Sequence, residues 1–280
     1  MSLLYQIYTV FAVFFGLVIG SFWNVAIARW PQDRSVVKPR SACPSCGTPI
    51  AWFDNIPILS WVLLRGECRE CGWSIPALYP LIELLGGLLG LLLYWRFIPN
   101  PSALQLPNIL ATIVYGYFVT ALIVSTYVDI RHRIIPDEVS IYAVPVGIAG
   151  CALLEWVGYT GPFQIGWRGA VLGAACGGGT FAGLAAAAYF LTGREALGLG
   201  DVKMLAMIGA FLGPHPALFL ILFGASVSSS VIGLGATAIL RRRVFLPFGP
   251  ALAAWSLVYL FYADQLLLIA NPAARWTWWI

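Results

Sequence analysis

The chain has 280 residues, of which 60% are hydrophobic and only 10% are charged, and its mean hydropathy is +0.84. Soluble domains carry about 25% charged residues, so this composition excludes a soluble globular protein and predicts an integral protein of the lipid bilayer. The net charge of +4 comes from basic residues scattered over short loops, which argues against a nucleic-acid-binding protein.

Apolar runs separated by helix-breaking residues predict an all-α, polytopic membrane protein with about eight transmembrane helices. The opening run is too long for a signal-peptide core of roughly 7–15 residues, so we expect it to be the first span. The sixth run is short for a bilayer core of about 30 Å, and we expect it to be tilted, half-buried or continuous with a re-entrant segment. The expected spans lie near 5–28, 77–98, 108–128, 139–157, 167–191, 202–213, 217–240 and 247–270.

The positions of the basic residues predict the orientation of the chain. Thirteen of the 16 Lys and Arg residues fall in four loops on one side of the membrane, whereas Arg96, Arg168 and Arg275 fall on the other. Loops rich in Lys and Arg face the cytoplasm, so both termini are expected to face outward. The thirteen are Arg29, Arg34, Lys38, Arg40, Arg65, Arg69, Arg131, Arg133, Arg194, Lys203, Arg241, Arg242 and Arg243.

The loop 29–76 is the one sizeable polar piece, and it separates a first span (1–28) from a helical membrane core (77–280). It contains two Cys-x-x-Cys pairs at a spacing close to that of a four-thiolate zinc site: Cys43, Cys46, Cys68 and Cys71. We expect a structural zinc ion here, since four thiolates leave no open position for catalysis. Two disulfides or unligated thiols are the alternatives, and a reducing cytoplasm disfavours the disulfides.

Two aspartates lie at the ends of apolar runs on the expected cytoplasmic side. Asp201 belongs to Gly198-Leu199-Gly200-Asp201-Val202-Lys203, and Asp129 precedes Arg131-His132-Arg133-Ile134-Ile135-Pro136-Asp137. Carboxylates at membrane depth are costly and are read first as functional. Two facing carboxylates can share one proton and act as an acid/base pair. We therefore expect Asp129 and Asp201 to be catalytic.

Asp137 competes with Asp129 for this role, because both flank the Ile134-Ile135-Pro136 segment. Proline followed by an acid is typical of a helix start, which gives Asp137 a structural explanation. Asp129 has none, since a negative charge is unfavourable at the C-terminal end of its own helix. We expect Lys203 to anchor its helix at the membrane interface.

Taken together, these motifs resemble the prepilin peptidases, membrane aspartyl proteases of the GxGD type. The resemblance extends over essentially the whole chain. It rests on Gly198-x-Gly200-Asp201-x-Lys203 with Asp129, and on Gly20-Ser21-Phe22, Asn24-Val25, Arg29-x-Pro31, Arg40-Ser41-x-Cys43-Pro44-x-Cys46, Asn55-Ile56-Pro57, Tyr79-Pro80-x-x-Glu83, Ile134-Ile135-Pro136-Asp137 and Pro247-Phe248-Gly249-Pro250 with Leu252-Ala253.

The resemblance implies a multi-pass protein of the bacterial inner membrane that removes the basic leader from type IV prepilins or type II secretion pseudopilins at the cytoplasmic face. It implies that Asp129 and Asp201 are the catalytic pair. Members with the cysteine loop also methylate the new N-terminus with S-adenosylmethionine, and their four cysteines bind zinc. These proteins carry an acid just inside the second span, and Glu83 at that position is our candidate for a role in methylation.

Two other classes of function remain as alternatives. A transporter could use the two aspartates as a proton or cation relay, but transporters more often show inverted repeats and acids near the bilayer midplane. A structural member of a secretion assembly would leave the two carboxylates unexplained. The sequence leaves the oligomeric state open.

Overall fold

A computed structural model describes residues 3–193, 198–241 and 247–270. Among these residues the regular structure is helical, and the extended pairing is limited to two isolated bridges. The all-α prediction is therefore confirmed for the described part of the chain. Arg194, Arg242, Arg243 and Arg275, which were used to predict orientation, lie outside it.

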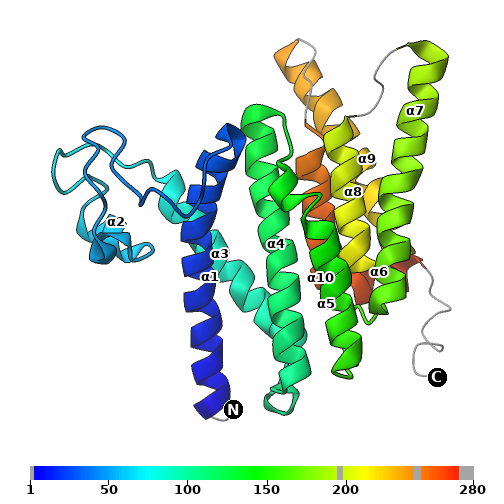
Figure 1. Ribbon diagram of the computed structural model, residues 1–280, viewed down its shortest axis with the longest axis horizontal. Helices are drawn as coiled ribbons and strands as arrows, with labels where there is room; N and C mark the ends of the chain where they lie inside the picture. The colour runs from blue at the N-terminus through cyan, green and yellow to red at the C-terminus, as the bar shows by residue number, and fades with distance from the viewer. Residues whose placement is uncertain (1–2, 194–197, 242–246, 271–280) are drawn as a thin grey trace. The chain divides into compact units, whose positions relative to one another are not determined.

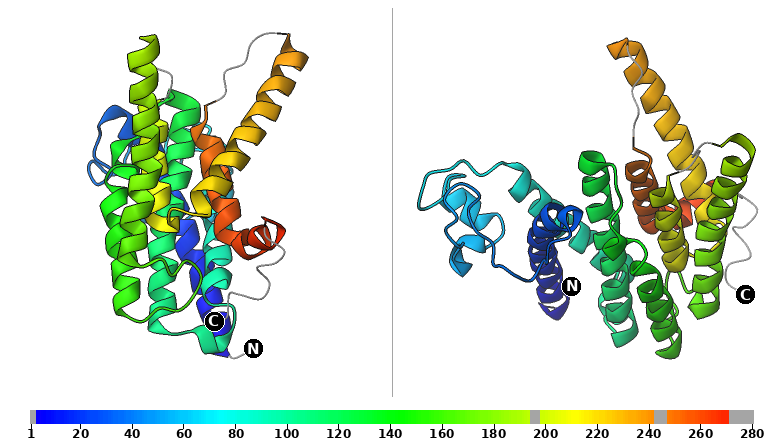
Figure 2. Two further views of the ribbon diagram at one scale, coloured as in Figure 1. Left: turned by 90° about the vertical axis from the view of Figure 1, so that its right-hand side faces the viewer. Right: turned by 45° about the horizontal axis from the view of Figure 1, so that its top comes forward.

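Six segments have the length and apolar composition of membrane spans, which confirms a multi-pass membrane protein. They are Leu3–Gln32, Leu78–Phe97, Leu106–His132, Asp137–Trp156, Gly166–Leu191 and Ala217–Leu240. The predicted total of eight would also need two further helices. One is α8 (Leu199–Leu212), and the other is α10 (Gly249–Ala270), whose backbone leaves helical geometry at Tyr262. Figure 2 shows the two parts of α10 running in different directions.

The chain divides into two compact units, and the first is Met1–Val124. Here α1 (Leu3–Arg29) and α3 (Leu78–Phe97) cross and pack against each other (Figure 1). The first part of α4 (Leu106–His132) joins them, because the Trp23 indole donates a hydrogen bond of 3.1 Å to Thr120. Between α1 and α3 the chain forms the short elements η1 (Trp30–Gln32), η2 (Trp52–Asn55) and α2 (Leu59–Leu63), and η3 (Pro101–Ala103) follows α3.

The second unit, Ser125–Ile280, holds the end of α4 and the remaining helices. Three consecutive elements, α6 (Gly166–Ala174), η5 (Ala175–Gly179) and α7 (Thr180–Thr192), form one helical span from residue 166 to residue 192. The glycine-rich η5 at its centre is a wide turn of the kind found as a π-bulge within α-helices. The remaining elements of the unit are η4 (Asp137–Val139), α5 (Ala143–Trp156), α8, α9 (Ala217–Leu240) and α10.

Helix α8 lies at the centre of this unit and contacts α5, α6, η5, α7, α9 and α10. All nine residues of α8 from Met204 to Leu212 except Ala206 are buried. The approach to α6 is close enough that a Cβ at Gly209 would overlap the backbone of Gly173. At 14 residues, α8 is only about 21 Å long at the usual rise per residue, which confirms that the sixth run is short for a bilayer. Its neighbours, rather than lipid, surround its apolar side chains.

Candidate active site and metal centre

Asp129 and Asp201 come together within the second unit. Asp129 lies in the last turn of α4 and is only 7% exposed, and Asp201 lies half-buried in the first turn of α8. The two carboxyl groups are close enough to interact electrostatically. Two acids on different helices, both withdrawn from water, make the arrangement in which a pair of carboxyl groups can share a proton.

A third helix supports Asp129. Helix α10 begins at Gly249, and the backbone N–H of Gly249 donates a hydrogen bond to the Asp129 carboxylate. The N-terminus of a helix carries free N–H groups and a partial positive charge, so it stabilises a nearby anion. This contact offsets the unfavourable position of Asp129 at the C-terminal end of α4. The sequence offered Gly249 only as part of a family motif, and its contact with Asp129 was not predicted.

The space beside Asp129 admits no side chain at position 249. A Cβ at Gly249 would lie 2.6 Å from Oδ2 of Asp129, far inside the roughly 3.5 Å of a favourable contact between non-bonded carbon atoms. Gly249→Ala is therefore expected to displace the Asp129 carboxylate and to lower the activity of the aspartate pair at least about tenfold. Gly235→Ala is the matched control, because apart from the adjacent residues and the nearby backbone of α9, no atom lies within 4 Å of a Cβ at Gly235. Equal activity of the two variants would show that the Gly249 contact does not matter.

Ile135 closes the site from the segment that follows α4. Its side chain is 8% exposed, and its Cγ1 atom would lie 3.2 Å from a Cβ at Gly200 in α8. Its Cδ1 atom would lie 3.4 Å from a Cβ at Gly249 in α10. Ile135 therefore fills the space between the first turns of two helices that carry the site. Close packing therefore explains why position 200 is a glycine, since a larger side chain there would press on Ile135.

Asp137 does not belong to the carboxylate pair. Its Oδ1 atom lies 2.7 Å from Nζ of Lys203, and the two side chains are 51% and 32% exposed. The ion pair joins the segment after Asp129 to the helix that carries Asp201. The prediction that Lys203 only anchors its helix at the interface missed this partner.

The ion pair is expected to help hold Asp129 and Asp201 in position relative to each other, with a modest effect on activity. Pairs this exposed contribute about 0.2–1 kcal/mol, so Lys203→Met or Asp137→Asn is expected to lower the activity of the pair by at most about fivefold. The exchanged variant Asp137→Lys/Lys203→Asp should recover part of that loss. Activity of the exchanged variant at or below that of the single variants would rule out the ion pair as the cause.

The four loop cysteines meet in one cluster. Their Sγ atoms all lie within 4.8 Å of one another, and each cysteine pair lies on a tight turn of the same form. In the first turn the Cys43 N–H donates to the Thr48 carbonyl, and the Gly47 N–H donates to the Cys43 carbonyl. The second turn repeats both bonds 25 positions later, from the Cys68 N–H to the Trp73 carbonyl and from the Gly72 N–H to the Cys68 carbonyl. One isolated bridge closes each turn, between Ala42 and Pro49 and between Glu67 and Ser74.

The cluster has the dimensions of a tetrahedral zinc site. Zn–S bonds of about 2.3 Å at tetrahedral angles hold neighbouring sulfurs about 3.8 Å apart. The Sγ atoms of Cys43 and Cys71 are 3.8 Å apart, and none of the cysteines is in a disulfide. Among the described residues, these four form the one group of metal-ligating side chains that meets this spacing. Four converging thiols fit zinc better than the two disulfides considered from the sequence.

The thiols are arranged to ionise but crowd one another. Hydrogen bonds from the Thr48 side chain and backbone lower the pKa of Cys46 to about 6, and the N–H groups of Cys71 and Glu70 lower that of Cys68. The Trp73 N–H lowers the pKa of Cys71, but burial and the neighbouring sulfurs outweigh it and raise the value to about 11. A divalent cation relieves this repulsion between thiolates.

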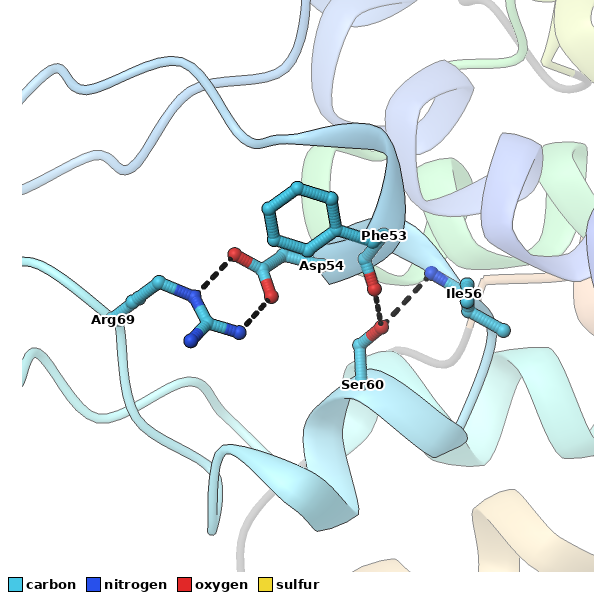
Figure 3. A network of polar contacts seen from close by, with 5 residues as sticks. All are labelled: Phe53, Asp54, Ile56, Ser60 and Arg69. Atoms are coloured by element: carbon cyan, nitrogen blue, oxygen red, sulfur yellow. Dashed lines mark hydrogen bonds and ion pairs between the residues drawn. The ribbon is translucent and has the colours of Figure 1, made fainter.

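Polar contacts tie the second cysteine turn to the rest of the loop (Figure 3). Arg69 makes a two-pronged ion pair with Asp54, at 2.8 and 2.5 Å, which holds the pKa of the Asp54 carboxyl below its usual range. The Ser60 hydroxyl accepts from the Ile56 N–H and donates to the Phe53 carbonyl, both at 2.9 Å. The segment between the cysteine pairs is therefore ordered by its own side chains.

Glu83 lies in the second turn of α3, within the first unit. It is half-buried, and its Oε2 atom accepts a hydrogen bond of 2.7 Å from the Ile58 N–H of the cysteine loop. Glu83 also lines a cavity of about 670 Å³ that lies between α1, α3 and that loop and is open to the outside.

The fold and these centres define a multi-pass helical membrane protein with a paired-carboxylate site and a separate four-thiol site. The family model described as the type IV leader peptidase family matches residues 116–234, and that of the bacterial peptidase A24 N-terminal domain matches residues 14–97. The chain belongs to the type IV leader peptidase family.

The relatives share the name prepilin leader peptidase/N-methyltransferase. The protein of Myxococcus xanthus is 40% identical over 81% of this chain, which spans 63% of that relative's length. The protein of Aeromonas salmonicida is 32% identical over 90% of each chain, and that of Neisseria gonorrhoeae is 33% identical over 96% of this chain and 93% of the relative. No solved structure matches the chain.

Proposed function

We propose that this protein removes the basic leader peptide from type IV prepilins or pseudopilins and then methylates the new N-terminal amine. The observation that carries the peptidase half is the meeting of Asp129 and Asp201 from two helices. The names of relatives that cover most of this chain support both halves. We place the protein in the bacterial inner membrane with its active site at the cytoplasmic face, because the sequence predicts Asp129 and Asp201 on the same side as the Lys- and Arg-rich loops, and such loops face the cytoplasm.

Asp129 and Asp201 act as one acid/base unit that carries a single proton. The ionised member takes a proton from water, which attacks the scissile carbonyl, and the protonated member donates a hydrogen bond to the carbonyl oxygen. The Gly249 N–H keeps the Asp129 carboxylate in place. Gly198 leaves room for a peptide backbone next to Asp201, whereas Ile135 fills the space beside Gly200. We assign this chemistry to the helical core, 77–280.

Methyl transfer belongs to the cysteine loop, 29–76, with the first span 1–28 beside it. S-adenosylmethionine supplies the methyl group when bound. Cys43, Cys46, Cys68 and Cys71 would hold a structural zinc ion, which fixes the two turns of a loop that has little core of its own. Glu83, which accepts a hydrogen bond from the loop backbone, is the residue we assign to methylation.

The proposed function is tested by the intact mass of a purified prepilin after incubation with the protein and S-adenosylmethionine. Loss of the leader and gain of one methyl group are expected. Loss of the leader alone would reduce the proposal to a peptidase with a structural cysteine loop. An unchanged substrate, from protein shown to be folded, would overturn it and favour a transporter.

A further inference from the structure

The cavity of the first unit has the size of a small-molecule site. Its volume of about 670 Å³ falls within the roughly 300–1,000 Å³ of ligand pockets, and most of its lining is apolar. It lies between α1, α3 and the loop that carries the four cysteines, and every residue that lines it lies between 18 and 83. The carboxylate pair of the second unit contributes nothing to it.

Glu83 is the anion in the half-buried part of this cavity. The Ile58 N–H and the Ser21 hydroxyl hydrogen-bond to its carboxylate, and within the described residues no Lys or Arg pairs with it. The other acids of the lining differ, since Asp54 is neutralised by Arg69 and Glu70 is exposed at the rim. A half-buried carboxylate without a counter-charge is costly to keep ionised, and a cationic ligand beside it lowers that cost.

The backbone around Glu83 is built to hold this carboxylate in place. Ile58 has a φ of +61°, a conformation that β-branched residues avoid, and the Leu59 N–H closes a three-residue turn onto Pro57 at 2.6 Å. From the other side, α1 lies so close that a Cβ at Gly20 would sit 2.7 Å from Cα of Glu83. Backbone strain of this kind persists where the surroundings enforce it, and it is concentrated at functional sites.

Aromatic rings line the rest of the cavity, among them Phe53, Trp61, Trp73 and Tyr79. Trp61 is fixed by its indole N–H, which donates a hydrogen bond of 3.0 Å to the Ile75 carbonyl, and its ring lies 3.0 Å from where a Cβ at Gly66 would be. Aromatic faces attract cations and stack on flat heterocycles. Besides Arg29, Glu70 and the Asp54–Arg69 pair, the lining thus combines one half-buried carboxylate that has no charged partner with ring surfaces, which suits a cationic ligand that carries a nucleobase.

We propose that this cavity binds the sulfonium methyl donor, with its positive sulfur at Glu83 and its nucleoside against the aromatic rings. This proposal rests on the methyltransferase activity proposed above, and it adds the place where the methyl donor binds. In the reaction, the neutral N-terminal amine uses its lone pair to form the N–C bond to the methyl carbon. The C–S bond breaks with its electron pair remaining on sulfur, and the resulting secondary ammonium releases a proton to water.

This arrangement makes the site selective for charge. The donor is a cation at sulfur, whereas the thioether that remains after transfer is neutral at that atom. Glu83 therefore attracts the donor and has no such attraction for the product. A charge-neutral replacement at position 83 should remove this preference and leave the aromatic contacts in place.

The test is calorimetric binding of two probes, S-adenosylmethionine and S-adenosylhomocysteine, to the full-length, metal-loaded chain in detergent. Glu83→Gln keeps the size of the side chain and an oxygen for the Ile58 N–H. It is expected to weaken binding of S-adenosylmethionine about tenfold and that of S-adenosylhomocysteine less than twofold. Glu70→Gln removes the same charge from the rim of the same cavity and is expected to change either affinity less than twofold.

Equal weakening of both probes by Glu83→Gln, or an effect no larger than that of Glu70→Gln, would overturn the proposal. Retention of metal and of leader cleavage shows that the Glu83→Gln chain is folded. Ser21→Ala, which keeps the charge, provides a second variant that should retain the preference for the donor.

Two results with the wild-type protein separate the cavity assignment from the proposed function. If the protein binds the donor with the Glu83-dependent preference but leaves mature pilin unmethylated, the proposed function fails and the cavity assignment stands. If the protein methylates mature pilin but binds neither probe, only the cavity assignment is wrong.

Discussion

Asp201→Asn and Asp129→Asn are each expected to abolish leader cleavage. Asparagine is close in size to aspartate but neither ionises nor carries the shared proton, so both acid and base catalysis stop. Acid/base groups contribute roughly 10²–10⁴-fold each, and the two aspartates act as one unit, so either substitution should cost at least about 10³-fold. The measurement is the initial rate of leader release from a purified prepilin.

Asp137→Asn is the matched control for this loss. It removes a carboxylate from the same region, but Asp137 is half-exposed and pairs with Lys203 rather than with the other acids. Its effect should stay within about fivefold, as expected for an exposed ion pair. If Asp137→Asn proved as damaging as Asp129→Asn, the assignment of the pair would be wrong. Cleavage at the normal rate by either variant of the pair would contradict the shared-proton mechanism itself.

Cys43→Ser is expected to remove the metal and, with it, methylation. The Cys43 thiol is buried, and its sulfur lies 3.8 Å from that of Cys71, at the centre of the cluster. Three remaining thiolates leave the tetrahedral shell open, so the metal content should fall from about one ion per chain to well below one. The cysteine turns form one wall of the cavity that contains Glu83, so methylation should fall at least about tenfold. Leader cleavage should persist.

The matched control is Cys176→Ser in the glycine-rich turn of the second unit. Cys176 is an exposed free thiol outside the cluster, so this variant should keep its metal and its methylation. Metal content is measured by elemental analysis of the purified chains. An unchanged metal content in Cys43→Ser would overturn the four-thiolate assignment. Loss of cleavage together with methylation would show that the loop is needed for the peptidase as well.

Local sequence patterns predicted those features that depend on short stretches of chain. Hydropathy predicted the helical membrane class, and the short sixth run corresponds to α8, which is 14 residues long. The spacing of Cys43, Cys46, Cys68 and Cys71 predicted their convergence. The bias of basic residues placed Asp129 and Asp201 on one side, which is the condition for their pairing, although their catalytic role stays a prediction.

Features that depend on the approach of distant segments were not predictable. The contact of Gly249 with Asp129 joins residues 120 positions apart and depends on where α10 begins. Nothing in the chain around Lys203 indicated its partner Asp137, because the pair forms only when the two segments pack. The same holds for Glu83 and Ile58, which are brought together by the folding of the cysteine loop over α3. Periodicity and spacing describe elements, whereas these contacts arise between them.

The claim that cleavage and methylation use separate sites is tested most directly with the Asp201→Asn chain and two substrates. The chain is incubated with S-adenosylmethionine and either a full prepilin or a mature pilin with a free N-terminus, and intact masses are measured. The account predicts an unchanged prepilin and a mature pilin heavier by one methyl group. Cleavage of the prepilin, or a mature pilin left unmethylated by a chain that still holds its metal, would contradict it.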